Sequence, residues 1–132
     1  MIRQEFKVEH YWQVVIFYNL DYNFLSMLVY ELKQIGFSWK QVVSILYELK
    51  TGEAKACTCS SLERHISIVL FTFHRSKKDY INSIAHEAEH IKQAMLKAYH
   101  VEDAGEPPAY TIGYLVEKMY RVFKDLICAG CI

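Results

Sequence analysis

The chain has 132 residues, 52% of them apolar and 23% charged, which suits one folded domain and excludes a wholly disordered chain. Fifteen basic and fifteen acidic residues give a formal net charge of zero, so there is no evident nucleic-acid partner and no polybasic membrane anchor. The first residues contain no apolar stretch, and no apolar run approaches the ~18 residues that span a bilayer. We therefore expect one cytoplasmic domain over residues 1–132, with no membrane partner.

Residues 6–52 predict a strand followed by a helical hairpin. Residues 11–18 are β-branched and aromatic, which is typical of a strand. Apolar residues then recur at helical spacing up to Gly36 and again after Ser38, ending at Gly52. Ser38 is a suitable N-cap for the second helix, and the two glycines suit helix ends.

Residues 54–73 predict a β-hairpin, with strands near residues 54–60 and 65–73. The second of these is apolar on both faces, so we expect it in the interior of a sheet. Helical periodicity returns over residues 78–99 and again over 107–127, where Pro107 and Pro108 suit a first helical turn. The sequence therefore predicts an α+β fold, in which a small antiparallel or mixed sheet packs against these last two helices.

The motif HExxH lies inside the predicted helix 78–99, as His86, Glu87 and His90. Residues four apart share one helix face, so the two imidazoles can bind one metal ion, and Glu87 can reach a water molecule on that metal. Both histidines lie roughly opposite the apolar stripe that contains Ile84 and Ile91. The competing interpretation is a pair of solvent-exposed histidines with no ligand.

The second half of the chain resembles the small gluzincin-like zincins, sometimes called minigluzincins, of bacterial and phage or mobile-element genomes. The similarity lies in a hydrophobic strand, an HExxH helix, and then a glutamate that begins the next helix in the segment EPPAY, residues 106–110. This resemblance implies a zincin-like fold with Zn²⁺ bound by His86, His90 and Glu106. It also implies that Glu87 acts as a general base.

Several neighbours compete with Glu106 for the position of third ligand. His100, Glu102 and Asp103 lie in the same loop, and each has a side chain suited to zinc. A carboxylate at a helix N-terminus, such as that of Glu106, is also favourable without any metal. The identity of the third ligand is therefore open at this stage.

The leading functional prediction is a zinc metallopeptidase that hydrolyses a peptide or protein substrate through a metal-activated water. Tyr110 lies four residues after Glu106, so it is a candidate oxyanion donor. A packed, hydrogen-bonded tyrosine is the alternative for that residue. The alternative for the whole chain is a non-catalytic binding or structural protein that keeps a zincin scaffold.

Four cysteines occur as two close pairs, Cys57 with Cys59 and Cys128 with Cys131. A reducing cytosol favours free thiols, although the CxC and CxxC pairs together could form a four-thiolate zinc site. We predict that the cysteines are neither paired in disulfides nor required for zinc.

Overall fold

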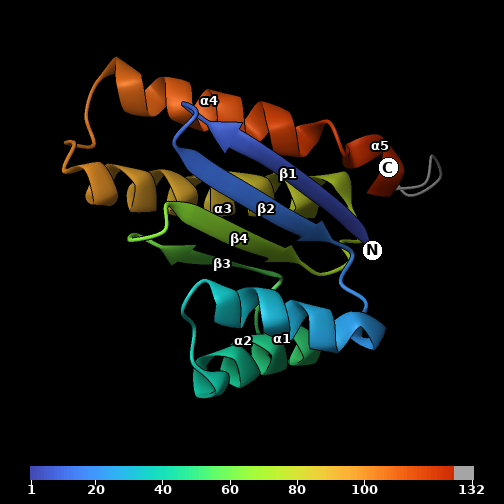
Figure 1. Ribbon diagram of the computed structural model, residues 1–132. Helices are drawn as coiled ribbons and strands as arrows, with labels where there is room; N and C mark the ends of the chain where they lie inside the picture. The colour runs from blue at the N-terminus through green and yellow to red at the C-terminus, as the bar shows by residue number, and fades with distance from the viewer. Residues whose placement is uncertain (127–132) are drawn as a thin grey trace.

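A mixed four-stranded sheet, built from two β-hairpins, organises this α+β chain in a computed structural model that describes residues 1–126 (Figure 1). Strands β1 (Ile2–Val8) and β2 (Trp12–Tyr18) form the first hairpin, and β3 (Ala56–Ser61) and β4 (Ile66–Phe71) form the second. The strand order is β1-β2-β4-β3, and the central strands β2 and β4 are parallel. The sequence left an antiparallel or a mixed sheet open; the sheet is mixed, and β3 is one of its two edges.

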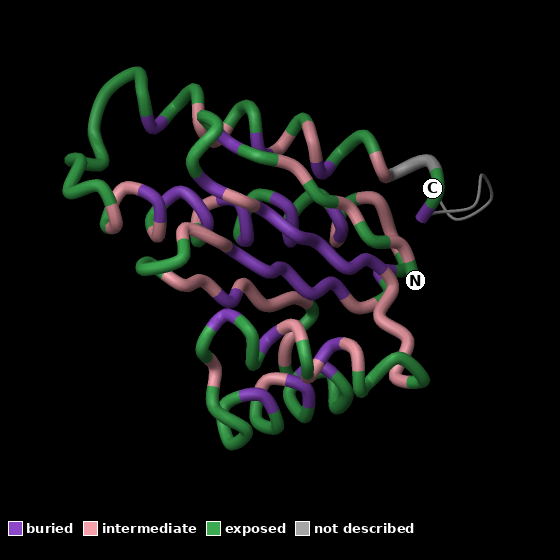
Figure 2. The backbone as a smooth tube through the Cα atoms, in the orientation of Figure 1, coloured by how far each residue is buried: buried purple, intermediate pink, exposed green. Residues whose placement is uncertain are grey.

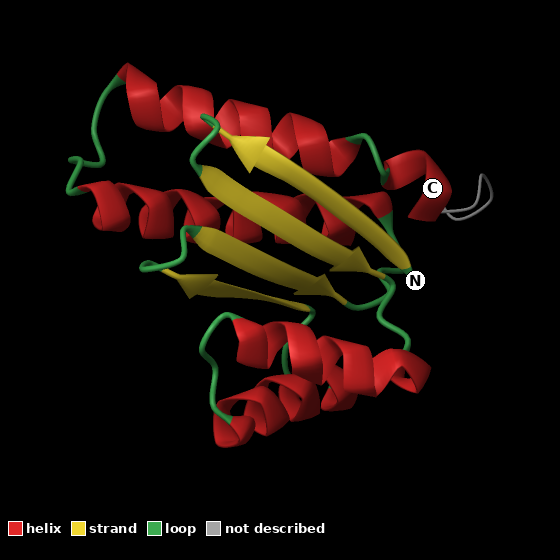
Figure 3. Ribbon diagram, viewed as in Figure 1, coloured by secondary structure: helices red, strands yellow, loops and turns green. Residues whose placement is uncertain are grey.

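Helices follow each hairpin. After β2 come a short 3-10 helix η1 (Tyr22–Phe24), α1 (Leu25–Gln34) and α2 (Trp39–Thr51). After β4 come α3 (Lys77–Tyr99), α4 (Glu106–Tyr120) and the short α5 (Phe123–Leu126). The order of two strands and two long helices thus occurs twice, and each pair of long helices folds back on itself (Figure 3).

The two helix pairs cover opposite faces of the sheet. Successive side chains of a strand point to opposite faces, so Val14 and Ile16 of β2 pack with α3 and α4, whereas Val15 and Phe17 pack with α1 and α2. Figure 2 shows that β2 and β4 are buried along almost their whole length. Burial on both faces explains why these strands read as continuous apolar runs.

Helix ends lie where the capping residues predict them. Ser38 caps α2 and forms a capping box with Gln41, while Gly52 ends that helix in a left-handed conformation. Ser76 caps α3, where its hydroxyl accepts a hydrogen bond from the backbone N–H of Asp79. The predicted helical hairpin and the predicted β-hairpin are both confirmed.

Two elements differ from the prediction. The first seven-residue strand, β1, was not predicted as a separate element; it alternates exposed and half-buried residues, because only one of its faces meets the core. The predicted helix 107–127 is interrupted after Tyr120, where Val122 and Asp125 donate backbone hydrogen bonds three rather than four residues back. This turn lets Leu126 pack into the core, and residue 127 lies outside the described part. Within residues 1–126, no helix is long and apolar enough to cross a membrane.

Candidate metal centre

The HExxH motif lies in the middle of α3, and the packing of that helix separates its residues. Ile84, Ala88 and Ile91 lie in the core beneath the sheet, which turns His86 and His90 toward solvent. Their Nε2 atoms approach within 3.1 Å, and their ring centroids are 4.7 Å apart. The predicted pairing of the two imidazoles is therefore present in the structure.

The separation of the two nitrogens can be compared with what a metal requires. Two ligands at ~2.0–2.1 Å from a tetrahedral zinc ion lie ~3.3 Å from each other. The 3.1 Å between the Nε2 atoms is close to this value. The two histidines therefore fit two corners of a tetrahedral site with little movement.

The side chain of Glu87 lies on the buried face of α3. Only 3% of its surface is exposed, and its Oε2 accepts a hydrogen bond from the hydroxyl of Thr58 on β3. A buried carboxylate without a partner is unfavourable, so this bond compensates for part of its lost hydration. The side chain is held at the junction of α3 with the edge strand.

His86 and Glu87 open onto one hollow of about 260 Å³ between α3 and the start of β3. The other residues that line it come from both elements: Ala54, Lys55, Ala56, Asn82 and Ser83. Lys55 is the only lysine or arginine among them, and its Nζ lies 3.6 Å from a carboxylate oxygen of Asp79. His86, Glu87 and Lys55 therefore border one space, and the Lys55 ammonium group lies close to Asp79.

Ser83 is fixed in this hollow by a buried histidine. The Nδ1–H of His74 donates to the backbone carbonyl of Thr72 at 2.8 Å, which leaves Nε2 to accept from the Ser83 hydroxyl at 2.7 Å. Burial disfavours the charged imidazolium and lowers the pKa of His74. Through these two hydrogen bonds, His74 links the loop before α3 to the second turn of that helix.

The structure does not bring a third predicted ligand to the histidine pair. Glu106 is exposed at the first residue of α4, and no group of three or more His, Cys, Asp or Glu side chains within residues 1–126 is placed to hold a metal. Asp103 is occupied elsewhere, because its carboxylate lies 2.9 Å from the Nζ of Lys92. His100 ends α3 in a left-handed conformation, and Glu102 is exposed.

Tyr110 lies away from the histidine pair. It is 72% exposed and lines a different cavity, formed by the end of α3, the start of α4 and the β1–β2 turn. The structure therefore does not bring Tyr110 into the hollow that contains His86 and Glu87.

Cys57 and Cys59 are free thiols whose sulfur atoms lie 4.0 Å apart on β3. The contact with Cys59 lowers the pKa of Cys57, and the same contact together with burial raises the pKa of Cys59. Cys128 and Cys131 lie outside the described residues. The CxC pair is thus free of a disulfide, as predicted.

Three residues of the candidate site were not identified from the sequence: Lys55 and Ser83, which line the hollow, and Thr58, which donates a hydrogen bond to Glu87. The sequence contains a signal that could have identified Thr58, because strand alternation places it on the same face as Ala56 and Ser60. A polar residue on the face of an edge strand that meets a helix needs a hydrogen-bond partner there. The partner, Glu87, could not be inferred without the packing of α3 beneath β3.

No family model, curated protein or solved structure matches this chain.

Proposed function

We propose that the chain is a zinc-dependent peptidase of zincin type, with the metal bound by His86 and His90 and with Glu87 as general base. The observation that carries the proposal is the 3.1 Å approach of the two Nε2 atoms beside a buried carboxylate. His86 and Glu87 line one hollow, so a water molecule there can meet both groups.

His86 and His90 fit two corners of a tetrahedral zinc site, and another residue has to provide the third protein ligand. Imidazole nitrogen is a preferred ligand of Zn²⁺, and catalytic sites use three protein ligands and one open position. Glu106 remains the predicted third ligand, because the carboxylate of Asp103 is paired with Lys92. Glu106 would have to reach the histidine pair from the first turn of α4.

The residues of the hollow have distinct roles in the proposed reaction. Zinc, when bound, polarises the scissile carbonyl and lowers the pKa of a water molecule. The carboxylate of Glu87 accepts the proton of the attacking water and transfers it to the leaving amine. Thr58 is a positioning residue, because its hydroxyl holds that carboxylate in one orientation.

Lys55 is better placed than Tyr110 to stabilise the negative charge that develops on the carbonyl oxygen. Lys55 lines the hollow together with Glu87, whereas Tyr110 lines another cavity. A cation that is already positioned where charge develops stabilises the transition state. We therefore assign this role in the proposal to Lys55.

The free edge of β3 suits an extended peptide. Hydrogen-bonded and non-hydrogen-bonded pairs alternate along an antiparallel ladder, and Thr72 donates its backbone N–H to Lys55 at one hydrogen-bonded pair. The backbone groups of Ala56, Thr58 and Ser60 consequently point away from β4. A substrate that pairs with them as an added strand would lie along β3, whose first residue, Ala56, lines the hollow.

Replacement of the general base tests the proposal. Glu87→Gln should keep bound zinc and abolish cleavage of a mixed library of fluorogenic peptides, because the base is required for the reaction and not for coordination. Glu48→Gln, on the exposed side of α2, is the matched control and should keep both. A wild-type protein that binds zinc but cleaves no member of the library would favour the non-catalytic scaffold instead.

A further inference from the structure

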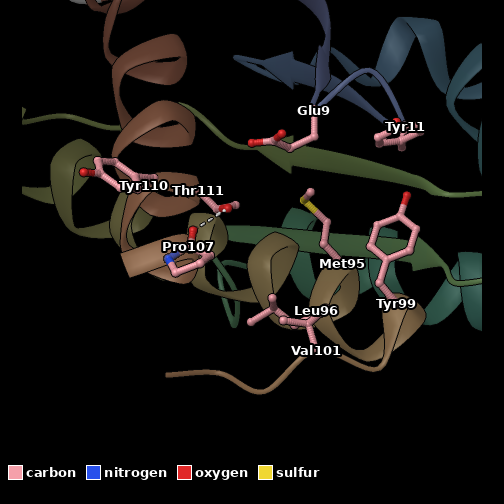
Figure 4. Close-up of a pocket in the computed structure, with 9 residues that line it drawn as sticks. All are labelled: Glu9, Tyr11, Met95, Leu96, Tyr99, Val101, Pro107, Tyr110 and Thr111. Carbon is pink, nitrogen blue, oxygen red and sulfur yellow. Dashed lines mark hydrogen bonds between the residues drawn. The ribbon is translucent and has the colours of Figure 1, made fainter. Parts of the chain in front are cut away.

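A second cavity lies beyond the histidine pair, at the C-terminal end of α3. It has a volume of about 660 Å³ and lies between the β1–β2 turn, the end of α3 and the start of α4 (Figure 4). This volume is within the ~300–1,000 Å³ of typical small-molecule sites. It shares no lining residue with the hollow that contains His86 and Glu87.

The lining of this cavity is apolar and aromatic. Met95 and Leu96 of α3 form its floor in Figure 4, with Tyr11 and Tyr99 at one end and Tyr110 at the other. The pKa of Tyr99 is raised by burial and by the nearby Tyr11, so the phenol is neutral at physiological pH. Tyr99 therefore offers an aromatic ring and no negative charge of its own.

Among the residues that the structure describes, Glu9 supplies the only charged side chain in the lining of the cavity. Figure 4 shows its carboxylate on the wall opposite Met95, directed across the cavity. Within residues 1–126 it forms no ion pair. The hydroxyl of Thr111, a further polar group of the lining, donates to the carbonyl of Pro107 at 3.0 Å, so it does not donate to this carboxylate.

The backbone that carries Glu9 adopts an unfavourable conformation. Glu9 and His10 have φ values of 54° and 63°, the positive values that a two-residue hairpin turn requires and that glutamate rarely adopts. The turn is closed by a 3.2 Å hydrogen bond from the N–H of Tyr11 to the carbonyl of Val8. This turn places Glu9 and Tyr11 together at one cavity.

Tyr99 is held in place before any ligand binds. Its ring makes edge contacts with His65 at 5.1 Å and with the fully buried Trp12 at 6.2 Å between centroids. Its hydroxyl also lies 3.4 Å from the Nδ1 of His65. A wall that is already ordered loses little conformational entropy when a ligand binds.

We propose that this cavity binds an organic cation, an alkylated ammonium group with an apolar body, through Glu9 and the tyrosine rings. Aromatic faces attract a cation that is weakly hydrated, and an unpaired carboxylate beside them adds charge complementarity. The apolar floor of Met95 and Leu96 accepts the uncharged part of such a ligand. The ammonium head alone would leave most of the volume unfilled, which is why the apolar body is part of the proposal.

Titration calorimetry with three probes tests the choice of a cation. Benzyltrimethylammonium and choline carry the charged head, and the neutral isostere of choline has carbon in place of the nitrogen. Choline should bind at least ~5-fold more tightly than its isostere, since a cation–π contact with a partly exposed ring contributes about 1 kcal/mol or more. Benzyltrimethylammonium should bind more tightly than choline because it fills more of the apolar volume. Equal affinity for choline and its isostere would overturn the proposal.

Two substitutions locate the site. Glu9→Gln keeps the size of the side chain and should lower the affinity for benzyltrimethylammonium by roughly 5–10-fold, as the loss of a charged partner implies. Tyr11→Leu should lower it by roughly 3-fold through the loss of one aromatic face. Glu63→Gln, in the exposed β3–β4 turn, is the matched control and should leave the affinity unchanged.

The alternative occupants give different results. Binding that Glu9→Gln and Tyr11→Leu both leave unchanged would contradict the proposal, and so would sedimentation showing that a second copy of the chain covers this face. Circular dichroism of each variant confirms that it is folded. The test uses no zinc and no hydrolysis, so its outcome is independent of the proposed peptidase activity.

Discussion

The hydroxyl of Thr58 donates a hydrogen bond to the carboxylate of Glu87, which joins the edge strand β3 to the HExxH helix α3. Thr58 is half-buried and Glu87 is almost fully buried. The bond therefore links the stability of the β3–α3 junction to the orientation of the proposed general base.

Removal of the Thr58 hydroxyl should affect both the stability of the fold and the orientation of Glu87. Thr58→Val keeps the shape of the side chain but leaves the buried carboxylate without its partner, which should lower the free energy of unfolding by about 1–3 kcal/mol. It should also reduce any peptide hydrolysis while zinc content is retained. Urea denaturation measures the first effect, and metal analysis with an activity assay measures the second.

Thr51→Val is the matched control, because Thr51 is exposed and its hydroxyl donates only to backbone carbonyls of its own helix. It should change stability by no more than about 0.5 kcal/mol. If both substitutions lower the free energy of unfolding by the same amount, the Thr58–Glu87 bond contributes no more than a hydrogen bond on the exposed surface.

His74 should make the fold sensitive to mild acid. Burial lowers its pKa below 6.5, so the unfolded chain binds a proton at a pH where the folded chain does not. Stability is then full above pH ~6.5 and falls as the pH drops through the folded pKa, with a slope of at most ~1.4 kcal/mol per pH unit. Urea denaturation of the wild type between pH 7.5 and 5 should show this loss.

A comparison of two histidine variants identifies the source of that slope. His74→Gln removes the buried imidazole and should flatten the dependence of stability on pH, even though the variant is less stable at every pH. His10→Gln changes an exposed histidine in the β1–β2 turn and should keep the wild-type slope. An unchanged slope in His74→Gln would rule out this residue as the cause.

Substitution of single carboxylate residues identifies the third zinc ligand. Zinc at a hundred times its Kd should stabilise the wild type by about 2.7 kcal/mol, and Glu106→Ala should lose most of that increment. Asp103→Asn should keep it, because Asp103 is paired with Lys92. Thermal denaturation with and without zinc measures both. If Glu106→Ala keeps the increment and a change at His100, Glu102 or Asp103 removes it, the assignment to Glu106 is wrong.

The cysteines should have no part in metal binding. Joint replacement of Cys128 and Cys131 by serine should leave zinc content unchanged, and a loss of zinc would move the site to the thiols. On β3, iodoacetamide should modify Cys57 before Cys59, because Cys57 is partly exposed and its pKa is lowered, whereas Cys59 is buried. Mass spectrometry of the peptides after short exposure measures the order.

Much of the fold could be predicted from local sequence signals. The Ser38 N-cap, the left-handed Gly52 and the doubly apolar β4 each depend on residues close in the sequence. Strand β1 was harder to identify, because a half-exposed edge strand with charged residues has a weak pattern. The parallel pairing of β2 with β4 joins residues about fifty positions apart, and no local signal specifies it.

In the candidate site, too, some features follow from local sequence and others depend on how distant elements pack. The pairing of His86 with His90 follows from helix geometry alone, so the spacing predicted it. The burial of Glu87 against Thr58 and the location of Tyr110 in another cavity depend on how α3 and α4 pack. The role of Glu106 also depends on that packing, and it stays a prediction.

The most direct test of the central claim is the zinc content of protein purified without added metal, measured by elemental analysis for the wild type and for His86→Ala and His90→Ala. The proposal predicts one zinc per chain in the wild type and loss of zinc in both variants, since each variant removes one of the histidine ligands and water is a much weaker ligand than imidazole. His10→Ala, a histidine outside the motif, should retain the metal. A wild-type chain that contains no zinc and takes up none on titration, or full zinc occupancy in both motif variants, would contradict the proposed metal centre.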